Sequence, residues 1–70
     1  SKECEEQIQI AISAAKIYFS LNEVSSVTVG LLKENDYFSG DSKVDRLSDT
    51  DTIEFSNDGY KFTGTKCEEE

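Results

Sequence analysis

Histidine is absent from this chain of 70 residues. Without histidine, neither a Ser-His nor a Cys-His nucleophile pair can be built. Zinc also lacks the commonest partner that it takes beside two cysteines. We therefore expect neither an enzyme nor a protein that carries a cofactor.

The sequence also lacks an apolar run of membrane-spanning length, a signal peptide and a lipidation motif. It begins Ser1-Lys2, without a methionine. We interpret the chain as a processed or trimmed piece of a longer product. On this interpretation, an export signal or an anchor was removed before residue 1.

Basic residues are scarce, with 7 against 15 acidic residues and a net charge of -8. A surface of this charge repels the phosphate backbone of nucleic acids and anionic lipid surfaces. We therefore expect no direct binding of nucleic acid.

Only two cysteines are present, Cys4 and Cys67, close to the two ends of the chain. A chain this short buries only about 60% of the surface that its unfolded form exposes, so its stability is marginal without a cross-link. A bond between the two cysteines would close a loop of nearly the whole chain and contribute roughly 4 kcal/mol. We predict this disulfide and an oxidising compartment; the alternative is two free thiols in a cytosolic chain.

One long helix is predicted at the start of the chain, from about Glu3 to Asn22. Glu3, Glu5 and Glu6 put negative charge in its first turn, where it complements the helix dipole. Asn22 can end this helix.

A second, shorter helix is predicted over VTVGLLKEN, residues 27–35, with Ser25 or Ser26 as its N-cap. Residues 37–51 are rich in serine, glycine and aspartate. This composition predicts a loop, with one short strand around Lys43 to Leu47.

The stretch TIEFSNDGYKFTGT, residues 52–65, alternates between apolar and polar side chains, as strands do. Its centre, Asn57-Asp58-Gly59, suits a type I turn closed by a glycine in the left-handed conformation. The apolar face of such a hairpin needs a cover, and the first helix is the only element large enough to provide it. The sequence therefore predicts an α+β fold, a long helix across a small antiparallel hairpin or meander.

The first helix has more apolar surface than one sheet can cover. One arc of its surface faces the expected sheet and holds Cys4, Ile8, Ala11, Ile12, Ala15, Tyr18 and Phe19. A second arc holds Ile10, Ala14, Ile17 and Leu21. Together the arcs span roughly 220°, against an apolar stripe somewhat over 100° in an ordinary surface helix.

The second arc follows spacings of 4, 3 and 4 residues, the spacings of a seam that one helix offers to another. Two interpretations stay open. The short second helix folds back over the seam within the same domain, or the seam meets identical helices in an assembly.

Three stretches of the chain together resemble the soluble part of type IV pilins and pseudopilins. They are the helix ending in AISAAKIYFSLN, the segment VTVGLLKENDYFSG and the terminal TIEFSNDGYKFTGTKC. The resemblance implies one pilin-like domain over residues 1–70. In it, residues 1–22 are the second half of a spine helix, 23–51 a short helix and acidic loop, 52–67 a hairpin and 68–70 a tail.

The family's known properties supply further expectations. The resemblance implies a structural subunit of a type IV pilus or pseudopilus-like filament, which polymerises through its N-terminal helix with copies of itself or with other pilins. It implies an extracellular or cell-surface location on a bacterial or archaeal envelope, and contact with the membrane only through a segment before Ser1. The family's usual disulfide joins two C-terminal positions, whereas Cys4 lies at the helix start, and the chain has no proline.

Two other interpretations concern the remaining polar and aromatic residues. Four aspartates of the loop, Asp41, Asp45, Asp49 and Asp51, offer the oxygen ligands that calcium prefers, but their spacing does not match a calcium-binding loop, so we expect weak binding or none. The alternative to a filament subunit is a small disulfide-linked extracellular module that binds a basic or apolar protein partner.

Overall fold

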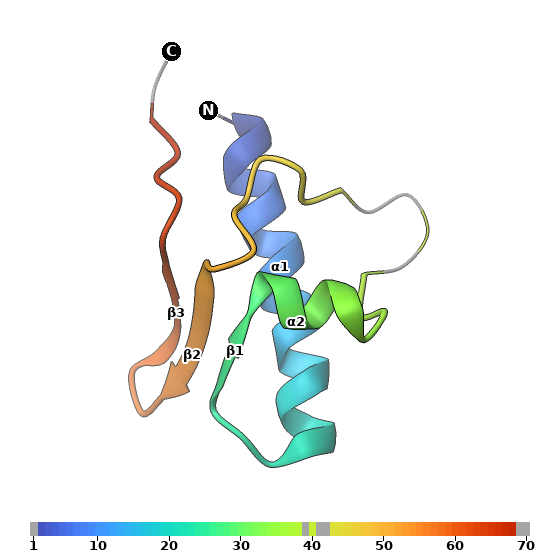
Figure 1. The fold of residues 1–70 in the computed structure, drawn as a ribbon. Coiled ribbons are helices and arrows are strands. Elements are labelled where there is room, and N and C mark those ends of the chain that lie inside the picture. Colours follow the sequence, from blue (N-terminus) through green and yellow to red (C-terminus); the bar gives the residue numbers. More distant parts are fainter. Residues whose placement is uncertain (1, 39, 41–42, 69–70) are drawn as a thin grey trace.

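The computed structural model describes residues 2–38, 40 and 43–68. Its elements, in chain order, are α1 (Lys2–Asn22), β1 (Ser26–Thr28), α2 (Val29–Glu34), β2 (Thr52–Ser56) and β3 (Gly59–Thr63). Figure 1 shows the long helix α1 lying against a small antiparallel sheet. The predicted α+β architecture is confirmed.

The sheet has three strands in the order β1-β2-β3, and both pairs are antiparallel. Ile53 is at its centre, opposite Val27 of β1 and Phe62 of β3. At the hairpin turn Ser56 pairs with Gly59, whose φ of 99° is left-handed. This confirms the glycine with positive φ that was predicted for the turn, a conformation that glycine adopts without the strain that a β-carbon would cause.

The N-cap predicted for the second helix is wrong. Thr28 is the N-cap of α2, and its Oγ1 accepts a hydrogen bond from the Leu31 N–H over 3.1 Å. The residues just before it form β1, because the β-branched Val27 and Thr28 fit a pleated strand, where Val27 is buried opposite Ile53.

The strand predicted around residues 43–47 is also wrong. This part of the chain is a turn, in which the Leu47 N–H donates to the Val44 carbonyl over 3.0 Å. Val44 and Leu47 are both buried. In a turn, two apolar side chains three positions apart can both point into the core. In a strand, residues three positions apart point to opposite faces of the sheet.

The core lies between α1, α2 and the sheet. Its completely buried side chains come from each of these elements: Ala11 and Ala15 from α1, Val29 and Leu32 from α2, and Ile53 from β2. Of the first predicted arc, Cys4, Ala11 and Ala15 are buried. Ile8, Ile12, Tyr18 and Phe19 are partly buried and pack against the core. The arc predicted to face the sheet therefore faces the core.

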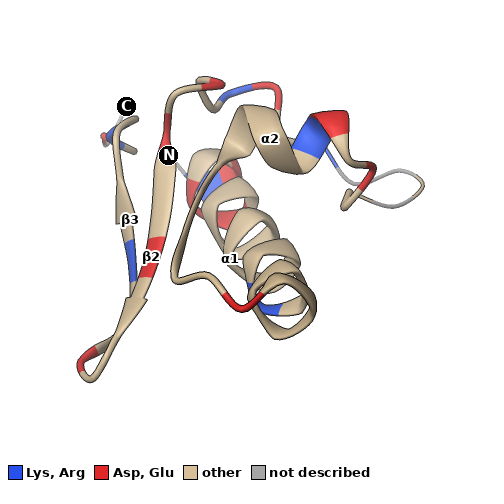
Figure 2. Cartoon of the chain, turned by 60° about the horizontal axis from the view of Figure 1, so that its bottom comes forward, with Lys and Arg blue, Asp and Glu red and all other residues tan. Residues whose placement is uncertain are grey.

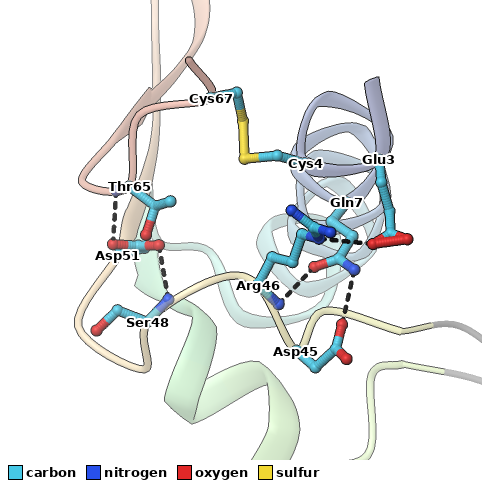
Figure 3. Close-up of a disulfide and its surroundings, with 9 residues drawn as sticks. All are labelled: Glu3, Cys4, Gln7, Asp45, Arg46, Ser48, Asp51, Thr65 and Cys67. Atoms are coloured by element: carbon cyan, nitrogen blue, oxygen red, sulfur yellow. Dashed lines mark hydrogen bonds and ion pairs between the residues drawn. A yellow bond between two sulfur atoms is a disulfide. The ribbon is translucent and has the colours of Figure 1, made fainter. Parts of the chain in front are cut away.

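The predicted disulfide between Cys4 and Cys67 is present, and it joins the first turn of α1 to the segment after β3 (Figure 3). The two Cα atoms are 5.4 Å apart, across 63 residues of sequence. The bond therefore links both ends of the fold, as the positions of the two cysteines in the sequence predicted.

Gln7 holds the turn at residues 44–47 against α1. Its buried side-chain amide donates from Nε2 to Asp45 Oδ1 over 2.8 Å and accepts at Oε1 from the Arg46 N–H over 2.8 Å. Arg46 also reaches Glu3 of α1 with its guanidinium group (Figure 3). Since a buried amide without partners is costly, these bonds fix where the loop returns to the helix.

Asp51 holds the other end of this loop. Its buried carboxylate accepts from the Ser48 N–H over 2.8 Å and from the Thr65 N–H over 3.0 Å (Figure 3). Its main-chain carbonyl accepts from the Val29 N–H at the start of α2 over 2.9 Å. One residue thus joins the loop, the second helix and the segment after the hairpin.

Across residues 2–38, 40 and 43–68, no helix combines the length and the apolar character that crossing a membrane requires.

Candidate interaction surface

The second predicted arc of α1 is only partly covered. Ala14 is buried and Ile10 is partly buried, whereas Ile17 and Leu21 are exposed, at 56% and 69%. Ala14 is buried because the core packs against this small side chain. The part of α1 that carries Ile17 and Leu21 therefore remains open to solvent. We call Ile10, Ala14, Ile17 and Leu21 the seam.

An open groove of about 320 Å³ runs along the first three residues of the seam and does not include Leu21. It is lined by Gln9, Ile10, Ser13, Ala14, Ile17, Tyr37 and Phe38. Its floor is therefore α1, and its wall is the segment that follows α2. A groove of this size and composition accepts apolar side chains or a small apolar ligand.

The wall of the groove is held in place by the end of α1. Tyr37 packs edge-on against Tyr18, with 5.1 Å between the ring centroids, and accepts a hydrogen bond from Asn22 Nδ2 over 3.3 Å. The Tyr37 N–H donates to the Leu32 carbonyl over 2.9 Å. These contacts give the wall a fixed position relative to the floor.

The seam lies on the uncharged part of α1. Between residues 7 and 22 the only charged residue is Lys16, and its ammonium group lies 5.1 Å from the ring centroid of Tyr60, on the side of the sheet. Figure 2 shows α1 in the colour of uncharged residues over most of its length. An uncharged helix face meets another protein surface without the cost of removing charges from water.

A second exposed apolar surface lies on the hairpin. Phe55 and Tyr60 are cross-strand partners, with ring centroids 4.7 Å apart and exposures of 48% and 38%. Tyr60 also stacks on Phe19 of α1, with 6.3 Å between the centroids. We call Phe55 and Tyr60 the aromatic ridge.

The aspartates considered for calcium do not meet at one site. Asp45 accepts from Gln7, Asp49 forms an exposed ion pair with Lys33 over 2.8 Å, and Asp51 is directed inward to the N–H groups of Ser48 and Thr65. Asp41 lies outside the described residues. Within those residues, no group of three or more acidic or cysteine side chains is arranged to hold a metal ion.

Sequence reasoning missed the wall of the groove. The pair Tyr37-Phe38 was assigned to the start of a loop, although two adjacent aromatic residues after an apolar helix are a signal of packing. It also missed Gln7, which was assigned no role, and the inward direction of Asp51. The partners of Gln7 lie 38 and 39 residues away, and Thr65 lies 14 residues from Asp51, too far for a local pattern to reveal.

Comparison of the chain with protein-family models, with curated proteins and with solved structures gives no match. The function is therefore argued from the residues and geometry of this chain.

Proposed function

We propose that the chain is a structural subunit of an extracellular filament of the type IV pilus or pseudopilus kind, which polymerises through α1. The observation that carries the proposal is the seam. It is apolar, uncharged and, at Ile17 and Leu21, exposed, although the rest of the chain carries a net charge of -8. Such a face is suited to a contact with another protein.

The size of the seam favours many neighbours over a single partner. Burying an isoleucine or leucine completely is worth about 1.5–3 kcal/mol, so two side chains that are already partly covered contribute about 2–4 kcal/mol at one contact. Association itself costs about 4 kcal/mol or more. One such contact makes a weak pair, whereas a subunit that contacts several neighbours at once is held firmly.

The disulfide supports a location outside the cytoplasm. Disulfides persist in oxidising compartments and are rare where glutathione keeps thiols reduced. The Cys4–Cys67 bond also fastens the sheet to the start of α1, so the sheet and the helix act as one body when α1 is bound.

The groove favours a second candidate function, a small extracellular module that binds an apolar side chain or segment of another protein. Its aromatic wall and its volume of about 320 Å³ suit such a ligand. The two functions differ in the occupant of the seam: copies of the chain in a filament, or a different protein in a binding module.

The proposal is tested by expressing the protein from its own gene in its own host. Surface material is examined by immunogold electron microscopy with an antibody against the chain. We expect labelled filaments, and we expect Ile17→Ser and Leu21→Ser to reduce them strongly. The control is Val24→Ser, which also removes an exposed apolar side chain, just after α1 and outside the seam.

Soluble, monomeric protein without labelled filaments contradicts the filament function. If the seam variants then lose a different co-purifying protein while Val24→Ser keeps it, the binding module is the better explanation.

A further inference from the structure

We propose that copies of the chain meet head to tail, with the aromatic ridge of one copy inserted into the groove of the next. This inference rests on the proposed function and extends it, because it names a second surface of the same chain as the occupant of the groove.

The two aromatic rings of the ridge are held in place within one copy, before any contact with a second copy. Phe55 and Tyr60 sit opposite each other on β2 and β3, so their backbones are fixed by the hairpin register. Tyr60 is supported by the stacked ring of Phe19 and by the ammonium group of Lys16. Large aromatic side chains that are already held in place lose little conformational entropy on binding, which makes them effective anchors.

The groove has the size and the lining to accept the aromatic ridge. A closed apolar cavity of about 150 Å³ accepts one benzene molecule, so a groove of about 320 Å³ has room for the two rings of the ridge. Its wall presents the aromatic residues Tyr37 and Phe38, and its floor presents Ile10 and Ile17. Aromatic rings packed against such a lining bury apolar area on both copies.

The proposed contact pairs one charged residue near each surface. Glu6 is exposed on α1, four residues before Ile10 and eleven before Ile17, so it continues the floor of the groove toward the helix start. Lys16 lies beside the ridge, over Tyr60. In the proposed contact the Lys16 ammonium group beside the inserted ridge faces the Glu6 carboxylate of the next copy, and Lys2 lies four residues before Glu6 on the same helix face. This pairing of opposite charges favours the contact in a chain that otherwise repels its copies.

A contact between two different surfaces leaves one free ridge and one free groove at the ends of every open assembly. Such a heterologous contact adds copies without limit unless the ring closes. The head-to-tail contact therefore builds an open-ended polymer or a closed ring, and not a symmetric pair.

The first experiment is complementation between two variants, followed by sedimentation velocity of the 70-residue chain over a concentration series at high salt. Phe55→Thr removes the more exposed of the two rings of the ridge and keeps a residue that favours strands. Ile17→Glu blocks the groove at an exposed position. Thermal unfolding checks that both variants are folded.

We expect the wild type to associate progressively, and each variant alone to associate at least about tenfold more weakly, as for loss of one anchor. An equimolar mixture of the two variants should form pairs and stop there, because only one intact ridge and one intact groove meet. If Phe55→Thr associates like the wild type, the groove meets another groove and the inference is overturned. Wild-type chain that stays monomeric throughout also overturns it.

The second experiment exchanges the charges. Glu6→Lys alone and Lys16→Glu alone should each weaken association, and the double variant should restore it. Loss of association in the double variant contradicts the pairing of these two regions.

The inference and the proposed function fail in different ways. If labelled filaments persist in the host with Phe55→Thr, the filament function stands and the head-to-tail contact is wrong. If the wild type forms no filaments, the filament function fails, whatever the purified chain does in solution.

Discussion

Gly64 lies so close to Asp51 that a β-carbon at residue 64 would come within 2.0 Å of the Asp51 Oδ1 atom. The same oxygen accepts the hydrogen bond from Thr65. The absence of a side chain at residue 64 is therefore what lets the segment after β3 reach the buried carboxylate.

Replacing Gly64 by alanine should lower the free energy of unfolding by about 2–4 kcal/mol, because backbone strain at its φ of 138° and the clash with Asp51 add together. The measurement is chemical or thermal unfolding. Gly59→Ala is the matched control, since Gly59 also has a positive φ but open space around it. Equal losses in the two variants would show that the contact with Asp51 contributes nothing.

Asp51→Ala should cost about 3 kcal/mol, because it leaves the N–H groups of Ser48 and Thr65 without their acceptor. Asp49→Ala is the control: it removes only an exposed ion pair with Lys33, worth about 1 kcal/mol or less. Denaturant unfolding of the two variants gives the comparison. A loss for Asp51→Ala as small as that for Asp49→Ala would contradict the role given to the buried carboxylate.

Reduction of the Cys4–Cys67 bond should lower the free energy of unfolding by about 4 kcal/mol, since the bond closes a loop of nearly the whole chain. Unfolding curves with and without reductant, and of the double variant Cys4→Ser with Cys67→Ser, measure this loss. Mass spectrometry of the folded, non-reduced protein checks the bond itself. Two free thiols there would refute the prediction.

Substitutions of Leu32 and Leu21 by alanine together distinguish an effect on folding from an effect on assembly. Leu32→Ala should cost about 2–5 kcal/mol, because the side chain is completely buried in the core. Leu21→Ala should change the stability of the isolated chain by about 0.5 kcal/mol or less, because its side chain is exposed. In the host, the same Leu21 variant should form fewer filaments. A large loss of stability for Leu21→Ala would mean that the seam serves the fold instead.

Calcium should raise the melting temperature little or not at all. Asp45, Asp49 and Asp51 have separate partners and face different neighbours, so they present no shared set of ligands. Thermal unfolding with calcium and with a chelator makes the comparison, because a ligand that binds only the folded state stabilises it by mass action. A large calcium-dependent rise would contradict this prediction.

The long helix and the hairpin could be predicted from the sequence because each shows its own period over many residues. The disulfide followed from two cysteines at the ends of a chain too short for a large core. β1 could not be predicted in the same way, since three residues are too few to show alternation, and Val27 and Thr28 fit a helix start as well as a strand.

The loop between α2 and β2 was beyond local patterns. Its path depends on the hydrogen bonds between Gln7 and both Asp45 and Arg46, which lie 38 and 39 positions further along the chain. It also depends on the bond that the Thr65 N–H donates to Asp51, 14 residues away. The seam was predicted from helical spacing, but its groove was not. The wall made by Tyr37 and Phe38 exists only because the loop turns back onto α1.

The Cys4–Cys67 bond has a mechanical consequence. Figure 1 shows the start of α1 and the segment after β3 at the same end of the molecule. When the chain is pulled from residues before Cys4 and after Cys67, the load passes through a covalent bond and bypasses the sheet and the core. The 62 residues between the two cysteines, residues 5–66, cannot extend under that load. The fold then transmits tension as an inextensible link.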